Sequence, residues 1–314
     1  MPNSSPIICI LGPTASGKTN LSLALGEHFP IEIINVDSAQ VYKGLDIGSG
    51  KPSREQREQV PHHLMDMLDP KELYNAAQFC HDATLAIKDI LSRKKIPVLV
   101  GGTMLYFKAL QQGLSELPES DPSIRQQLEK QLQEKGLANL YQRLQTVDSE
   151  RASQIKPTDP QRILRALEIF EKTGKTMSQW LSLPKTALHN YDFINIGILP
   201  EETSREVLHQ RIALRFDEML SQGLIEEVKA LYDRGDLNDS MPAIRAVGYR
   251  QVWQYLSGDL SHDDMRDRAI AATRQLAKRQ LTWLRSWPQL LSFDLNDPAM
   301  QAKVGAILNK AWLE

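Results

Sequence analysis

The sequence predicts an α/β fold, with a P-loop parallel-sheet core and an inserted all-helical domain. Three observations lead to this prediction. Apolar runs at 7–11, 31–36 and 96–100 are separated by helical stretches, a pattern typical of a parallel sheet covered on both faces. The first run is followed by the pattern G-x-x-x-x-G-K-[ST]. From about residue 116 to 190 the periodicity is helical and no strand pattern appears.

The elements follow in order along the chain. The first strand, 7–11, leads through the glycine-containing turn into a helix, the second strand ends at Asp37, and the third ends at Gly101. Helices are predicted at 124–135, 137–144 and 160–172, a strand at 193–199, mostly helices over 203–287, then a strand at 290–295 and a helix at 300–313. We therefore expect a core formed by 1–115 and 191–314, with a helical C-terminal part, and a helical insertion at 116–190.

The composition is that of an ordinary globular protein. Among 314 residues, 41% are hydrophobic, 24% are charged and the formal net charge is −2, which suits a sizeable core. Cys9 and Cys80 are too few for a disulfide framework or a four-thiolate zinc site. No signal-peptide or membrane-span pattern is present, so we expect a cytoplasmic protein. Basic side chains outnumber acidic ones over 242–287, which favours a local polyanion site.

The phosphate-loop pattern is complete at every fixed position. Its residues are Gly12, Pro13, Thr14, Ala15, Ser16, Gly17, Lys18 and Thr19. The glycines allow backbone amides to close around phosphates, and the helix that follows adds a partial positive charge. Lys18 is expected to neutralise phosphate oxygens, and Thr19 to hold Mg²⁺. The strand before the loop and the helix after it make a chance match improbable.

The loop alone does not identify the phosphate compound. Most such loops bind ATP or GTP, but the strand 96–100 ends in Gly101-Gly102-Thr103, where a nucleotidase usually has an acidic magnesium ligand. Asp37 ends the neighbouring strand, at the sheet edge where ligands bind. A lone Asp there is usually a helix cap; its place beside a phosphate site favours a catalytic role.

Eight segments together resemble the tRNA isopentenyl transferase (tRNA dimethylallyltransferase) family in its bacterial form. They run in family order: GPTASGKT at 12–19, DSAQVYKGLDIGSGKP at 37–52, PHHLMDMLDP at 61–70, PVLVGGTMLYFKALQQGL at 97–114, DPQRILRALEIFEKTGK at 159–175, LHQRIALRFDEML at 208–220, AIRAVGYRQVW at 243–253 and TRQLAKRQLTWLR at 273–285. One departure is Ser49, where the family has threonine, and the zinc finger of some eukaryotic members is absent.

The resemblance implies transfer of a dimethylallyl group from dimethylallyl diphosphate to N6 of the adenosine immediately 3′ of the anticodon, by a monomer that uses Mg²⁺. The P-loop would bind the diphosphate of the donor, so no phosphoryl group would move. The implied catalytic residues are Asp37 as general base, Thr19, Lys18, Thr103 and Arg211. Arg215, one helical turn after Arg211, is the alternative for the diphosphate.

The resemblance also implies contacts to the anticodon stem-loop, in part from the insertion. The implied tRNA-binding residues are Asp37, Ser38, Ala39, Gln40, Thr103, Arg125, Gln161, Arg162, Ile163, Leu164, Arg165, Arg245, Ala246, Val247, Gly248, Tyr249, Arg250, Lys278, Arg279, Gln280, Leu281, Thr282, Trp283, Leu284 and Arg285. Helical periodicity independently places Arg274, Lys278 and Arg285 within about 40° of one another. It predicts Trp283 and Trp287 on the opposite, packing side. A solvated charged face is the alternative.

Two other functions compete with this interpretation. One is a P-loop kinase acting on a small molecule or nucleotide, with Asp37 as the base for a hydroxyl group and bound ATP as donor. The other is a non-catalytic tRNA-binding protein that uses nucleotide as a switch. His62, His63, Asp66 and Asp69 match no familiar zinc spacing, so we expect structural roles for them, and the same for Cys80.

Overall fold

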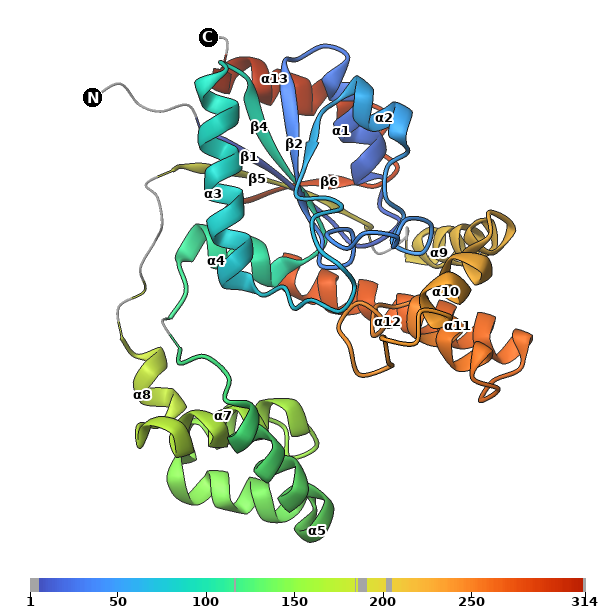
Figure 1. Cartoon of the computed structure of the whole chain (residues 1–314). Helices are drawn as coiled ribbons and strands as arrows, with labels where there is room; N and C mark the ends of the chain where they lie inside the picture. The colour runs from blue at the N-terminus through green and yellow to red at the C-terminus, as the bar shows by residue number, and fades with distance from the viewer. Residues whose placement is uncertain (1–5, 116, 184, 186–190, 202–204, 313–314) are drawn as a thin grey trace. The chain divides into compact units, whose positions relative to one another are not determined.

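The computed structural model describes residues 6–115, 117–183, 185, 191–201 and 205–312 (Figure 1). The chain divides into two compact units. The first comprises Met1–Gln111 and Leu188–Glu314, and the second comprises Gln112–Ala187. These limits lie a few residues from the bounds expected from the sequence, 116 and 190.

A six-stranded sheet forms the centre of the first unit. Its strands are β1 (Ile7–Leu11), β2 (Ile31–Val36), β3 (His62–His63), β4 (Ile96–Gly101), β5 (Phe193–Leu199) and β6 (Leu290–Asp294). Their order is β3-β2-β4-β1-β5-β6, and each strand pairs in parallel with its neighbours. The predicted parallel α/β fold is confirmed. Only β3 was not predicted, because two histidines carry no strand periodicity and are held by pairing with Ile33 and Ile34.

Helices cover both faces of this sheet. β1, β2 and β4 are buried along their whole length, which explains their continuous apolar sequences. α1 (Lys18–Gly26) and α13 (Met300–Trp312) pack together on one face, and α3 (Ala76–Ser92) covers the other (Figure 1). The right-handed crossovers of parallel strands require this division, because β1-to-β2 and β3-to-β4 run in opposite directions across the sheet.

The remaining helices of this unit are α2 (Arg54–Gln59), α4 (Met104–Gln112), α9 (Arg205–Ser221), α10 (Leu224–Tyr232), α11 (Tyr249–Leu256) and α12 (His262–Arg285). α2 contacts α1. α9 contacts α10 and α12, and α11 contacts α10 and α12. Within the described ranges, no helix has an apolar stretch of the length needed to cross a membrane.

The second unit consists of helices and loops over its described residues, with no β-strand among them. It contains α5 (Pro122–Val147), α6 (Ser149–Gln154), α7 (Pro160–Thr173) and α8 (Met177–Leu181). Gly136 interrupts α5 with φ 76° and ψ 164°, so the two helices expected at 124–135 and 137–144 meet at this residue. The unit has its own hydrophobic core, which includes Leu128, Leu140 and Leu167.

One carboxylate fixes a loop that borders the carboxyl edge of the sheet. Glu227 on α10 accepts the backbone N–H groups of Asp46 (3.1 Å), Ile47 (2.7 Å) and Gly48 (3.1 Å). It also accepts the Tyr249 hydroxyl at 2.5 Å. Burial, and then the charge of Glu227, raise the pKa of Tyr249, so this hydroxyl remains a donor. A single anion therefore satisfies three consecutive amides of a loop that lacks regular structure.

We predict that Glu227→Ala lowers the free energy of unfolding by about 3 kcal/mol, because it leaves charge-assisted hydrogen bonds unmade. Urea denaturation measures this change. The control is Glu226→Ala, at an exposed position in the same first turn of α10, which should cost about 0.5 kcal/mol or less. Equal losses for the two variants would show that the helix terminus, and not the loop, is what Glu227 stabilises.

Candidate functional site

The carboxyl ends of β1, β2 and β4 open into one large cavity of about 1160 Å³. The turns that follow these strands line it, and α9 and α12 complete its wall. All the lining residues belong to the first unit. Single small-molecule pockets usually enclose about 300–1,000 Å³, so this cavity is large enough to hold a donor and part of an acceptor together.

The phosphate loop connects β1 to α1 at one side of the cavity. Ala15 and Gly17 adopt positive φ angles of 63° and 91°, which turns successive amides of the loop toward one region. The Ser16 side chain is 1% exposed, and its hydroxyl has no hydrogen-bond partner among the described residues. Lys18 folds over the loop and donates from Nζ to the Pro13 carbonyl at 2.6 Å. The loop therefore presents amides and an ammonium group to a polyanion.

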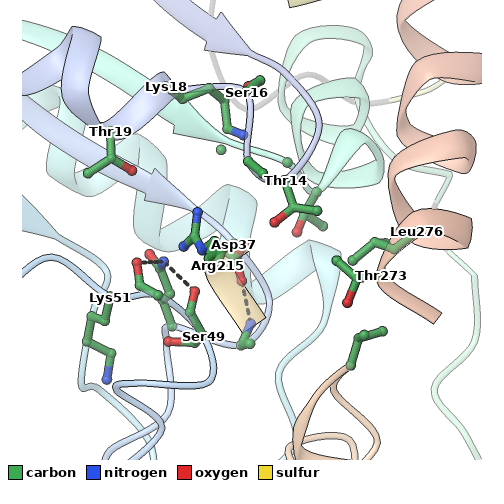
Figure 2. Close-up of a pocket in the computed structure, with 18 of the residues that line it drawn as sticks. Thr14, Ser16, Lys18, Thr19, Asp37, Ser49, Lys51, Arg215, Thr273 and Leu276 are labelled. Atoms are coloured by element: carbon green, nitrogen blue, oxygen red, sulfur yellow. Dashed lines mark hydrogen bonds between the residues drawn. The ribbon is translucent and has the colours of Figure 1, made fainter. Parts of the chain in front are cut away.

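The cations Lys18 and Arg215 line the cavity together with the carboxylate of Asp37. Burial, and then the charge of Arg215, lower the pKa of Lys18 to about 7, and Asp37 opposes this shift. The pKa of Arg215 is also lowered by burial, against the opposing charges of Asp37 and Glu218. Figure 2 shows Arg215 beside Asp37, close to the phosphate loop that carries Lys18. Burial thus disfavours the charged forms of both side chains, and a bound anion would favour them.

Arg211 and Arg215 both line the cavity, but their partners differ. Arg211 donates from Nη2 to Asn296 Oδ1 at 2.8 Å. Arg215 packs against Gly50, where an added Cβ would lie 1.7 Å from Nη2 of the arginine. Of the two arginines, Arg215 is the one whose charge lowers the pKa of Lys18, and the charge of Asp37 acts on Arg215 in turn. The geometry therefore favours the residue that the sequence offered as the alternative.

Asp37 is held by backbone contacts on either side. Its Oδ1 accepts the Ala39 N–H at 2.8 Å, and the Ser38 N–H donates to Thr103 Oγ1 at 3.1 Å. The Thr103 N–H in turn donates to the Val36 carbonyl at 3.1 Å. Gln40 donates from Nε2 to the carbonyls of Ser49 (3.1 Å) and Gly50 (3.3 Å) (Figure 2). Asp37 is thus fixed through one carboxylate oxygen.

The cavity also has an apolar part. Leu105, Leu214 and Trp283 line it and are 52%, 63% and 37% exposed. The sequence predicted Trp283 on the packing side of its helix. That prediction is wrong, because Trp283 lies at the cavity with the Lys108 ammonium 5.4 Å from its ring centroid. Trp287 is buried as predicted, but it lies after the end of α12. Exposed apolar side chains beside a phosphate site suit a ligand that has both an apolar part and a phosphate group.

The ranges assigned to tRNA contact prove too broad. Ile163 and Leu164 lie in the core of the second unit, and Leu281 and Leu284 are buried in the first. These four side chains pack inside the protein and do not face RNA in this structure. Gly248 and Tyr249 are also buried, but they line the cavity. The exposed members of the ranges are Gln161, Arg162, Arg245, Arg250, Lys278, Arg279, Thr282, Trp283 and Arg285. Partly exposed members are Asp37, Ala39, Gln40, Thr103, Arg125, Arg165, Ala246 and Val247, and Ser38 is exposed.

Several charged residues in each unit form structural ion pairs. Lys51 joins Asp46 and Asp66 at 2.6 and 2.5 Å, with its own side chain 1% exposed. His63 contacts Glu32 at 2.7 Å, and Asp69 pairs with Arg234 at 2.9 Å. Arg165 pairs with Glu168 at 3.1 Å. The part of the chain that the structure describes contains no group of three metal-ligating side chains. The His62–Asp69 segment thus has structural contacts, as expected.

Thr19 is compatible with a magnesium site of the kind that depends on substrate phosphates. It lines the cavity on the turn that presents the loop amides. Mg²⁺ commonly takes one or two protein ligands and completes its coordination with phosphate oxygens and water. A single hydroxyl, without an acidic cluster around it, fits that pattern.

Comparison with known proteins agrees with this geometry. The family model for IPP transferase matches residues 40–287. A tRNA dimethylallyltransferase of Coxiella burnetii is 50% identical over 303 residues, which cover 96% of this chain and 97% of that protein. A crystal structure of a full-length tRNA isopentenylpyrophosphate transferase from Bacillus halodurans is 35% identical, with a TM-score of 0.71 over 99% of this chain and 97% of that one.

A third similarity is to a eukaryotic dimethylallyltransferase whose structures show it acting on tRNA. It is 30% identical, with a TM-score of 0.80 over 98% of this chain and 79% of that one. Sequence and structure agree along nearly the whole chain, and the family model alone spans well over half of it. The chain belongs to the IPP transferase family.

Proposed function

We propose that this transferase moves a dimethylallyl group from dimethylallyl diphosphate to N6 of the adenosine immediately 3′ of a tRNA anticodon. One observation carries the proposal: Asp37 shares a cavity with the phosphate loop, two cations and an apolar wall. These features correspond to a proton acceptor, a diphosphate site and space for a hydrocarbon group. The named relatives act in the same chemical class.

The leaving group would be stabilised by the phosphate loop. As the bond between C1 of the dimethylallyl group and oxygen breaks, its electron pair goes to the diphosphate, where the negative charge grows. The loop amides, Lys18 and Arg215 are fixed donors for that charge. Mg²⁺ held by Thr19 and the phosphates would add further charge neutralisation. We assign the principal guanidinium to Arg215 and a peripheral role to Arg211.

Asp37 would be the general base. The lone pair of an adenine amine is delocalised into the ring, so removal of a proton as the C–N bond forms assists the attack. One carboxylate oxygen is occupied by the Ala39 amide, which leaves the other oxygen to accept the proton from N6. Thr103 holds the adjacent Ser38 amide, and its hydroxyl hydrogen remains available to a nucleotide.

The tRNA would be held by exposed cationic side chains of both units. On α12 these include Lys278, Arg279 and Arg285, and on α7 Arg162. The target base lies in an unpaired loop, so moving it into the cavity costs less than extracting it from a duplex. Phosphate contacts from these arginines and lysines would position the loop.

A kinase is less well supported by the same cavity. The turn after β4 has Gly101, Gly102 and Thr103, and none of them can supply the acidic magnesium ligand usual in nucleotidases. The exposed apolar side chains at the cavity also have no counterpart among the phosphates or ribose of ATP.

The function is tested by incubating the protein with Mg²⁺, dimethylallyl diphosphate and unmodified tRNA, then weighing the nucleosides of the digested tRNA. We expect an adenosine heavier by one dimethylallyl group. Asp37→Asn keeps an oxygen for the Ala39 amide and should retain tRNA affinity, while turnover falls by about 10²–10⁴. ATP consumption without modified tRNA would instead support the kinase. Wild-type turnover by the variant would exclude Asp37 as the base.

We predict that diphosphate binding takes up a proton through Lys18. In the free protein its pKa is about 7, so at pH 8 the amine is mostly neutral. A bound anion favours the ammonium form and raises this pKa. Affinity should therefore be full below pH 7 and fall as pH rises above it. Calorimetry of inorganic diphosphate in two buffers of different ionisation enthalpy counts the protons.

Inorganic diphosphate can itself take up or release protons when it binds. The Lys18→Met variant measures that contribution. The wild type should take up more protons than this variant at pH 8, and the difference should shrink at pH 6. If both proteins exchange the same number of protons at pH 8, Lys18 does not titrate on binding.

We also predict that Arg215→Gln raises the KM for dimethylallyl diphosphate by about tenfold or more, whereas Arg211→Gln raises it by a few-fold, because Arg215 shares the charge environment of Lys18 and Arg211 already donates to Asn296. Steady-state kinetics at saturating tRNA measures both values. A larger increase in KM for Arg211→Gln than for Arg215→Gln would assign the principal role to Arg211.

A further inference from the structure

Gln280 joins two loops of the active cavity. It lies on α12, and its side chain is 8% exposed. Its Oε1 accepts the N–H of Thr14 in the phosphate loop at 3.0 Å, and its Nε2 donates to the Gly102 carbonyl at 2.9 Å. Both ends of the amide are therefore used inside the protein, although the sequence had assigned this residue to tRNA contact.

The two partners fix the orientation of this amide. Thr14 offers a backbone donor and Gly102 a backbone acceptor, so a reversed amide would oppose donor to donor and acceptor to acceptor. Gly102 is also the residue that permits the approach, because a Cβ there would lie 2.4 Å from Nε2 of Gln280. The site is thus shaped for a glutamine amide on one side and for glycine on the other.

Two further hydrogen bonds connect this junction to the loop that carries Asp37. Thr103, which follows Gly102, accepts the Ser38 N–H at its Oγ1 and donates its own N–H to the Val36 carbonyl, both at 3.1 Å. Ser38 and Val36 flank Asp37. From the phosphate loop to the base, the connection therefore runs through Gln280, the Gly102-Thr103 turn and the Ser38 amide.

We propose that Gln280 is a positioning residue that sets the phosphate loop relative to the turn that holds Asp37. In the proposed reaction, on which this inference rests, the first loop carries the leaving group and the second carries the base. The distance between the leaving oxygen and N6 of the adenosine must fit the C1 atom that passes from one to the other. Small displacements of reacting groups slow such a transfer strongly. Lys278 and Arg279 are exposed on the same helix, so α12 would contact tRNA with one face and hold the loops with the other.

The test compares Gln280→Met with Gln111→Met. Both changes keep the side-chain volume and remove an amide that bonds residues distant in the sequence. Gln111 on α4 bonds Asn195 at 2.7 and 3.3 Å and Cys9 Sγ at 3.5 Å, and it does not line the cavity. We expect Gln280→Met to lower single-turnover transfer by about ten- to a hundredfold and to raise the KM for dimethylallyl diphosphate. Its tRNA affinity and salt dependence should stay within twofold of the wild type, and Gln111→Met should leave all three unchanged.

A second variant and a structural readout keep the test decisive if Gln280→Met folds poorly. Gln280→Glu keeps an acceptor for Thr14 but cannot donate to Gly102, so it should also slow transfer. Hydrogen exchange of the segment 12–17, without substrates, should speed up in Gln280→Met and not in Gln111→Met.

Weakened tRNA binding with unchanged donor kinetics would overturn the proposal in favour of an RNA contact. Unchanged transfer by both Gln280 variants would overturn it as well. A wild-type protein that makes no modified tRNA would contradict the proposed function instead, and the hydrogen-exchange comparison would still test the link between the loops.

Discussion

The site depends on an electrostatic constraint: Lys18 and Arg215 are brought together in a partly buried cavity, where the carboxylates of Asp37 and Glu218 offset their charge only in part. Each cation costs free energy to desolvate, and each raises the cost of the other. The fold imposes this cost, because the loop after β1 and the helix α9 meet at the carboxyl edge of the sheet. A bound diphosphate would relieve it. Ligand binding and the relief of like-charge repulsion would then be one event, and the charge that develops on the leaving group would meet donors already in place.

The parallel sheet brings the other reacting group to the same place. β1 and β2 both pair with β4, so the phosphate loop and Asp37 begin on either side of the turn at Gly101–Thr103. That turn has no acidic side chain for a metal and instead makes backbone and hydroxyl contacts to its neighbours. If the phosphate loop holds a leaving group, no phosphoryl group is transferred and no acidic magnesium ligand is needed for one, but the base must lie at a fixed distance. The turn lacks such an acid and is hydrogen-bonded to the loop that carries Asp37, and both features fit this chemistry.

The sequence predicted what is local and missed what joins distant segments. The phosphate loop, Asp37 and the buried strands were readable because each is a contiguous pattern with a strand beside it. Gln280 lies 266 residues from Thr14, so its bond to the loop has no sequence signature, and Glu227 is likewise remote from the amides it accepts. Arg211 and Arg215 lie one turn apart on the same side of α9, so only their partners separate them. Ile163 and Leu164 entered the predicted RNA contacts because a motif range does not distinguish core from surface positions.

The central claim is that the phosphate loop holds a leaving group and that the bond broken joins carbon to oxygen. Dimethylallyl diphosphate labelled with ¹⁸O at the bridge between C1 and phosphorus tests this directly, with the released phosphate species weighed after reaction with tRNA and Mg²⁺. The account predicts that all of the label leaves in diphosphate and that the modified adenosine contains none. Label retained on the dimethylallyl group, or release of monophosphate, would mean that a phosphorus–oxygen bond is broken and would contradict the account.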